Sequence, residues 1–223
     1  MFIKLSYPLS EETPVCFGYT VATKFIPVKR IVNGNHANTT EVHLFTHNGT
    51  HMDAPWHFNP EGRHIDELDV EDWVFNNPKA VDVSHRSSRN IDRSDIEPFF
   101  SKDDNSDLLL VFSGMSLLIE SNTKEYMENF PGFTSDAANF ILKETRVRAI
   151  AVDLPSVDPI ENILARNFPI HRMMLGDVKR SLIIIENVNI APVLGKKIKR
   201  VFAVPLLFKG LDGSPVNIFA EIG

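Results

Sequence analysis

The stretch His47-Asn48-Gly49-Thr50-His51-Met52-Asp53-Ala54-Pro55-Trp56-His57 decides how the rest of this 223-residue chain is interpreted. It brings four potential metal ligands or proton carriers into a short segment: His47, His51, Asp53 and His57. In an extended strand alternate side chains share a face, so we expect His47, His51 and Asp53 to point to one side. A helix would also bring His47 and His51 together, but Gly49 and Thr50 between them disfavour a helix.

Two residues of the stretch, Gly49 and Pro55, indicate how the backbone could make room for an ion and bend after the strand. Gly49 lies between the histidines on the same side, where a missing side chain leaves room for an ion. Pro55 ends regular strand pairing and lets His57 approach from another direction. Two imidazoles and a carboxylate are a usual ligand set for Zn²⁺, and Mn²⁺ or Fe²⁺ accept the same atoms. One strand histidine alone is more often structural, whereas three histidines with an aspartate at this spacing favour a metal site.

Weaker candidates lie outside the stretch. Glu186 ends the apolar run Leu182–Ile185, and a buried carboxylate needs a cation or hydrogen-bond donors. A metal, a structural salt bridge or a surface position at the strand end would each satisfy it. His171 is interpreted as a loop residue, and His43 as a candidate outer member of the site. Asp153 and Asp158 are expected to hydrogen-bond a turn that follows a strand.

The sequence predicts many strands with interspersed helices, all in one domain over residues 1–223. Phe25 to Val32 and Thr39 to His47 predict two strands joined near Asn33-Gly34. A helix is expected over Ser135 to Thr145 with Thr134 as its N-cap, and a shorter one between Arg93 and Pro98. Further apolar runs predict central strands covered on both faces: Ala80–Val83, Leu108–Phe112, Ala149–Val152, Leu182–Ile185 and Val201–Val204. The fold class is therefore α/β, or α+β with a mixed sheet.

Composition limits the partners. The net charge of −6 and pI of 5.7 argue against a nucleic-acid-binding surface. No apolar run reaches the ~20 residues that span a membrane, so no membrane partner is expected. Cys16 is the only cysteine, which excludes an internal disulfide and a cysteine-based zinc site. The segment Met1–Pro8 lacks the apolar stretch of a signal peptide, and we expect a cytoplasmic protein.

At these residues the sequence resembles the cyclase family of metal-dependent hydrolases, whose best-known enzymatic members are bacterial kynurenine formamidases. The family motif is a histidine, then glycine-threonine-histidine, an aspartate two positions later, a proline and a further histidine, as in 47–57. Further segments agree in order along nearly the whole chain: Leu5–Leu9, Thr13–Val15, Gly62, Ile65–Leu68, Pro131–Thr134 and Asp153–Asp158.

The resemblance implies a role for each matching residue. His47, His51 and Asp53 correspond to metal ligands, with Asp53 able to bridge two ions, and His57 corresponds to the catalytic acid/base. His171 and Glu186 match the later ligands, Glu186 again as a bridge. The implied fold is the swivelling β/β/α domain, and family members are commonly homodimers or higher homo-oligomers.

The sequence departs from the family pattern at two places. The stretch between His171 and Glu186 is longer than usual, with Lys179-Arg180-Ser181 as the extra turn. Formamidases carry an aromatic residue, often tryptophan, after the threonine-proline pair, where it packs on the substrate. This chain has Cys16-Phe17-Gly18, which leaves Phe17 as the candidate substrate contact.

The function that the resemblance implies is hydrolysis of an amide. Two ions bridged by carboxylates, Zn²⁺ first and Mn²⁺ as the alternative, hold a hydroxide that attacks the amide carbon. His57 then transfers a proton to the leaving nitrogen. N-formylkynurenine is the leading substrate, giving kynurenine and formate. The alternatives are a hydrolase of another cyclic amide or lactone such as isatin, a polyketide-type cyclase, and a non-catalytic metal- or ligand-binding relative.

Overall fold

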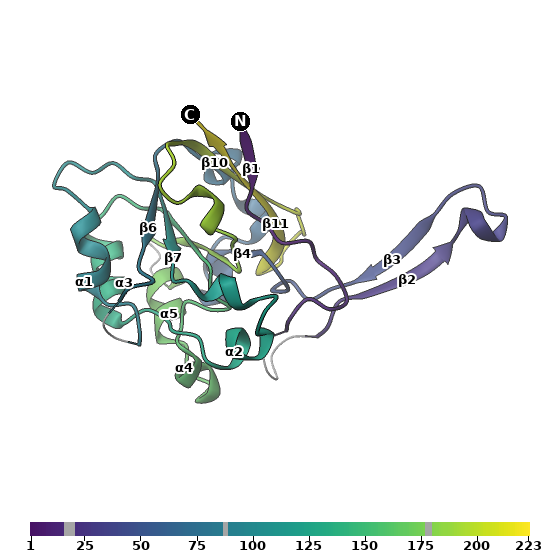
Figure 1. Cartoon of the computed structure of the whole chain (residues 1–223), viewed down its shortest axis with the longest axis horizontal. Helices are drawn as coiled ribbons and strands as arrows, with labels where there is room; N and C mark the ends of the chain where they lie inside the picture. Colours follow the sequence, from purple (N-terminus) through teal and green to yellow (C-terminus); the bar gives the residue numbers. More distant parts are fainter. Residues whose placement is uncertain (16–20, 87–88, 177–179) are drawn as a thin grey trace.

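The computed structural model describes residues 1–15, 21–86, 89–176 and 180–223. Phe17, the expected substrate contact, and Lys179, in the expected extra turn, lie outside the described residues. The described part holds one large mixed sheet, a separate two-stranded ribbon, and short helices packed against the sheet (Figure 1).

The strands follow one another in the chain as β1 (Phe2–Lys4), β2 (Lys24–Lys29), β3 (Thr39–His43), β4 (His51–Asp53), β5 (Val74–Phe75), β6 (Pro78–Asp82), β7 (Leu108–Phe112), β8 (Ala149–Val152), β9 (Ile183–Glu186), β10 (Ile198–Pro205) and β11 (Gly213–Ile222). The α-helices are α1 (Arg93–Ile96), α2 (Thr123–Glu128), α3 (Ser135–Glu144), α4 (Ile160–Leu164) and α5 (Pro169–Leu175). Short 3-10 turns lie between them: η1 (Ile31–Asn33), η2 (Pro55–His57), η3 (Ile65–Glu67), η4 (Val70–Trp73), η5 (Glu97–Phe99), η6 (Met115–Leu118) and η7 (Ala191–Val193).

Four parallel strands, β6 to β9 in that order, form one half of the sheet. Strands β7, β8 and β9 are apolar along almost their whole length because both faces are covered. Along β7, Leu109 and Val111 pack against the helices, while Leu108 and Leu110 pack against other strands. The predicted strands Leu108–Phe112 and Ala149–Val152 are confirmed to the residue.

The other half of the sheet is antiparallel and runs from β9 through β4, β11 and β10 to β5. Its apolar side chains, among them Phe75, Val201 and Ile218, share one core cluster with Leu108 and Leu110 of β7. The twisted sheet therefore curls until β10 comes close to β6. Antiparallel strands, parallel strands and helices make three layers, which confirms the expected α/β fold with a mixed sheet.

The helices cover the outer face of the parallel strands (Figure 1). The predicted helix is confirmed as α3: Thr134 Oγ1 accepts a hydrogen bond from the Ala137 N–H at 3.2 Å, and the helix ends at Glu144. The shorter predicted helix is confirmed as α1, which begins at Arg93 with Asp92 as its N-cap. No helix within the described ranges has the length and apolar character needed to cross a bilayer.

The predicted hairpin exists, but it is shorter than expected. Strands β2 and β3 pair antiparallel, and Gly34 in the connection has a φ of 82°, a conformation that glycine adopts easily. Strand β3 ends at His43, so residues 44–47 leave the ribbon and the expectation of a strand up to His47 is wrong. The ribbon extends away from the body of the protein (Figure 1).

Candidate metal centre

The expected metal ligands meet at β4, a three-residue strand that lies between β9 and β11. Antiparallel pairing places His51 opposite Glu186 of β9, and Asp53 opposite Gly213 of β11. Residues directly opposite each other in an antiparallel pair carry their side chains on the same face at close range. The register of the sheet therefore brings Glu186, from a distant part of the chain, to the motif histidine.

His47 reaches the same site from a turn rather than from the strand. Gly49 has a φ of 62°, and the turn that it allows carries His47 Nδ1 to within 2.8 Å of Asp53 Oδ1. The expectation of one strand face for His47 and Asp53 is therefore wrong, although the side chains do meet. The expected space for an ion at Gly49 is also wrong, because a Cβ there would point at Leu9 Cδ1, 3.0 Å away.

Two buried carboxylates, Asp53 and Glu186, share two buried histidines. His51 Nε2 lies 3.4 Å from Asp53 Oδ1 and 3.3 Å from Glu186 Oε2. On the other side, His171 Nε2 lies 3.5 Å from Asp53 Oδ2 and 3.3 Å from Glu186 Oε1. Each carboxylate thus turns one oxygen to His51 and the other to His171.

Hydrogen bonds fix the orientation of both histidine rings. His51 Nδ1 lies 2.9 Å from the Gly49 carbonyl, and His171 Nδ1 lies 2.7 Å from Asp158 Oδ2. Carbonyl and carboxylate oxygens only accept, so each Nδ1 donates, and in the neutral ring Nε2 keeps its lone pair toward the carboxylates. An acceptor behind the ring is the usual arrangement for a metal-binding histidine.

Helix α5 positions His171, so the expectation that this residue lies in a loop is wrong. Pro169 occupies the first turn of α5, where its missing N–H costs nothing. Asp158 accepts the backbone N–H groups of Ile170 and His171, both at 3.0 Å, as well as the ring N–H. Asp158 therefore holds the start of the helix and the histidine ring together.

These residues fit a divalent metal ion. Two ligand atoms bound at about 2.1 Å to one tetrahedral ion lie about 3.4 Å apart. The nitrogen-to-oxygen gaps of 3.3–3.5 Å around Asp53 and Glu186 match that spacing. Asp53 Oδ2 is buried and accepts no hydrogen bond from the described part of the chain, which is costly unless a cation lies nearby. Two ligand groups, His47–His51–Asp53 and Asp53–His171–Glu186, share Asp53.

The histidines keep both carboxylates ionised. Burial by itself raises the pKa of Asp53, but His47, His171 and His51 hold it well below its usual value. Burial also raises the pKa of Glu186, and His171 and His51 bring it below the usual value. Burial lowers the pKa of His51, yet Asp53 and Glu186 raise it to about 10. The centre is therefore organised around two buried negative charges.

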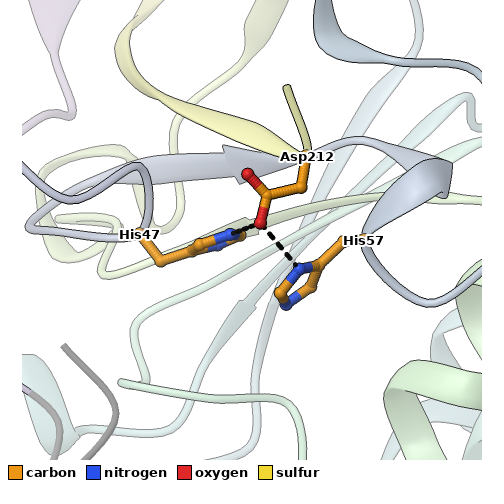
Figure 2. Close-up of side chains that lie close together, drawn as sticks. All are labelled: His47, His57 and Asp212. Carbon is orange, nitrogen blue, oxygen red and sulfur yellow. Dashed lines mark hydrogen bonds and ion pairs between the residues drawn. The ribbon is translucent and has the colours of Figure 1, made fainter. Parts of the chain in front are cut away.

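A residue that the sequence did not single out, Asp212, joins the motif at its outer side (Figure 2). Its Oδ2 lies 2.9 Å from His47 Nε2 and 3.2 Å from His57 Nδ1. Burial raises the pKa of Asp212, but the bonds from His47 and His57 hold it below its usual value. Asp212 directly precedes β11, so only the pairing of β11 with β4 brings it to the motif.

The centre forms one wall of a cavity of about 240 Å³. His57, on η2, lies at its edge with its side chain 26% exposed, as expected from the bend at Pro55. The rest of the cavity lining is mainly aromatic and aliphatic: Phe45, Phe58, Pro155, Ile163 and Phe168. A flat apolar group fits such a cavity beside the polar cluster.

The remaining sequence candidates, His43 and Asp153, and two residues near the motif, Trp56 and His64, have other surroundings. His43 is exposed on the β2–β3 ribbon, and His64 caps η3, so neither belongs to the cluster. Trp56 packs against His64 with ring centroids 4.6 Å apart and the ring planes tilted by 38°. Asp153 accepts hydrogen bonds from the turn 113–116, which confirms its expected structural role. Phe17 remains outside the described residues.

Comparison of the sequence with known proteins identifies a family and named relatives. A family described as "Putative cyclase" matches residues 3–159 of the chain. The chain is 30% identical over 217 residues to the kynurenine formamidase of Bacillus thuringiensis (strain Al Hakam), covering 97% of this chain and 95% of the relative. The kynurenine formamidase of Bacillus anthracis shows the same identity and coverage.

Solved structures share the fold. Isatin hydrolase A from Labrenzia aggregata, bound to benzyl benzoate, superposes with a TM-score of 0.84 at 20% identity, covering 99% of this chain and 93% of that one. A "predicted metal-dependent hydrolase" from Bacillus stearothermophilus gives a TM-score of 0.76 at 21% identity, covering 99% and 97%. These matches confirm the cyclase-type β/β/α fold expected from the sequence.

The geometry predicts which side chains bind metal. After dialysis against buffer without metal, Asp53→Ala, which removes the carboxylate shared by both ligand groups, should lower the metal bound per chain to near background, and His51→Ala should lower it by the share of one group. His43→Ala is the matched control, because it removes an exposed histidine and should leave the metal content unchanged. Inductively coupled plasma mass spectrometry on folded, dialysed protein measures the ratio. Wild-type metal content in Asp53→Ala would contradict the assignment.

Proposed function

We propose that this chain hydrolyses an N-formyl aromatic amide. The chain belongs to the cyclase family, and it is a metal-dependent hydrolase that acts on carbon–nitrogen bonds other than peptide bonds. N-formylkynurenine is the leading substrate, with kynurenine and formate as products, in keeping with the names of the relatives at 30% identity. The observation that carries the proposal is the buried carboxylate pair beside an aromatic cavity with His57 at its edge.

The proposed metal is Zn²⁺, with Mn²⁺ as the alternative, because the ligands are imidazole nitrogens and carboxylate oxygens. We propose two ions, one held by His47, His51 and Asp53 and the other by Asp53, His171 and Glu186. When bound, such ions polarise a carbonyl oxygen and lower the pKa of water. Asp53 belongs to both groups, so it would be the ligand shared by the two ions.

The side chains around the cavity supply orientation and proton transfer. His57 donates its Nδ1–H to Asp212, and Figure 2 shows the other ring nitrogen turned away from that carboxylate. This nitrogen is the proposed proton carrier for the leaving amine. Phe58 and Phe168, whose ring centroids are 5.5 Å apart, are placed to pack on the aromatic ring and exclude water.

A substrate panel tests the proposal. The metal-loaded protein should hydrolyse N-formylkynurenine, chelation should abolish turnover, and Zn²⁺ or Mn²⁺ should restore it. Isatin is the second candidate, because it presents the same type of bond in a cyclic amide on an aromatic ring. If the protein hydrolysed isatin but not N-formylkynurenine, the proposed substrate would be a cyclic amide and not a formamide. Full activity in rigorously metal-free protein would contradict the metal-dependent mechanism.

Replacing His57 should separate chemistry from metal binding. His57→Ala should lower kcat by roughly 10²–10⁴-fold, the usual contribution of a general acid/base. KM should change little, because the lost proton transfer is made in the transition state. Metal content and melting temperature should stay near the wild-type values. Loss of metal together with activity would show that His57 is a ligand instead.

We also propose that the chain forms a homodimer or a higher homo-oligomer through the β2–β3 ribbon. Ile26, Val28 and Val42 are exposed there, and a lone two-stranded ribbon is only marginally stable in water. The two strands and their connection, residues 24–43, carry three basic residues, Lys24, Lys29 and Arg30, and a single acid, Glu41, whereas the whole chain has a net charge of −6. Sedimentation at micromolar concentration should give a multiple of 25.2 kDa, and a monomer would contradict this proposal.

A further inference from the structure

Asp212 occupies a place between two histidines with different expected tasks. Its Oδ2 lies 2.9 Å from His47 Nε2 and 3.2 Å from His57 Nδ1 (Figure 2). The rings of His47 and His57 lie close to each other, with centroids 4.1 Å apart. One carboxylate oxygen therefore contacts both a ring of the metal centre and the ring at the edge of the cavity.

The chain holds Asp212 firmly in this place. Its second oxygen, Oδ1, accepts a hydrogen bond from Thr46 Oγ1 at 3.1 Å. Its carbonyl accepts the Ala54 N–H at 2.9 Å, which ties it to the end of β4. Next to it, Gly213 lets His47 approach, because a Cβ there would lie 2.9 Å from His47 Cε1.

The chemistry of the contacts defines the direction of each hydrogen bond. An ionised carboxylate only accepts, so His47 must donate from Nε2 and His57 must donate from Nδ1. Asp53 Oδ1 is an acceptor too, so His47 Nδ1, 2.8 Å away, also donates in this structure, and a metal ion bound at Nδ1 would take the place of that proton. His57 keeps a lone pair on Nε2, the nitrogen that faces away from Asp212.

We propose that Asp212 is a positioning residue that fixes the tautomer and the orientation of both His47 and His57. It thereby ensures that the metal-binding nitrogen of one ring and the proton-carrying nitrogen of the other are available together. The part that concerns His57 rests on the proposed hydrolase function, whereas the part that concerns His47 rests on its hydrogen bonds and on metal binding by His47, and it does not depend on the substrate.

A rival role for Asp212 is that of a metal ligand, because ligand atoms of His47, His57 and Asp212 lie within 4.8 Å of one another. The hydrogen bonds favour positioning. Both oxygens of Asp212 are occupied by donors at 2.9–3.2 Å, whereas Asp53 Oδ2 accepts none from the described residues. The buried carboxylate oxygen that lacks a hydrogen-bond donor within the described residues thus belongs to Asp53.

Three variants test the proposal. Asp212→Ala removes the acceptor, Asp212→Asn keeps an oxygen that can accept, and Asp104→Ala is the control. Asp104 is also a partly buried carboxylate with an ion pair, to Lys79, but it contacts neither histidine. Melting temperature verifies that each variant is folded, and Asp212→Asn keeps the test decisive should Asp212→Ala be unstable.

Three measurements are made on each variant. Chelator competition gives metal affinity, which Asp212→Ala should lower by about 10–100-fold, the usual cost of losing the acceptor behind a ligating histidine. ¹⁵N NMR of the imidazoles in metal-free protein reports the tautomers, and His57 should lose its preference for the Nδ1–H form. At saturating metal, kcat should fall at least tenfold with KM little changed. Asp212→Asn should recover part of each loss, and Asp104→Ala should match the wild type.

Two results would overturn the proposal. The first is wild-type metal affinity and wild-type tautomers in Asp212→Ala. The second is the loss of one ion per chain at saturating metal in both Asp212 variants, which would make Asp212 a ligand. Affinity and tautomers are measured without substrate. If the wild type hydrolysed no amide while Asp212→Ala still lost affinity, the proposed function would fail and the role toward His47 would stand.

Discussion

The structure depends on one electrostatic constraint: two carboxylates, Asp53 and Glu186, are buried side by side on neighbouring strands. Two like charges in a protein interior are tolerated only with cations or donors around them. His51 and His171 lie between the carboxylates, and Asp158 and the Gly49 carbonyl orient these rings. The surrounding turns and the start of α5 are arranged to deliver these groups, which is why a centre suited to divalent metal forms here.

The sheet supplies the geometry at the point where it changes from parallel to antiparallel pairing. Strand β9 pairs with β8 in parallel and with β4 antiparallel, so the short motif strand is inserted beside the end of a buried core strand. Strand β11 then lines the other side of β4 and places Asp212 beside the motif. A catalytic arrangement spread over distant parts of the sequence thus follows from the register of three strands.

The local parts of this arrangement could be predicted from the sequence. The apolar run Leu108–Phe112 and the N-cap Thr134 depend on neighbouring residues alone, and both were predicted correctly. The same holds for the proximity of His51 and Asp53, which are alternate residues of one strand. The resemblance to a known family added Glu186 and His171, which the register and helix α5 place beside them.

The rest depends on tertiary structure. Asp212 has no local pattern that distinguishes it from any aspartate before a glycine, and only the β4–β11 register gives it a role. His171 was expected in a loop, whereas α5 begins at Pro169, because a proline is tolerated in the first turn of a helix. His47 was expected on a strand because the alternation of residues does not reveal the left-handed turn at Gly49.

The central claim is that Asp53 and Glu186 hold metal together with His51 and His171. Anomalous X-ray diffraction from crystals grown with Zn²⁺ or Mn²⁺ tests it most directly, because the signal locates the ion without reference to any substrate. The account predicts anomalous density at the carboxylates, with one ion within ligand distance of His51 and Asp53 and the other within ligand distance of His171, Asp53 and Glu186. Density confined to His57 and Asp212, or hydrogen bonds from the histidines to Asp53 and Glu186 with no metal between them, would contradict it.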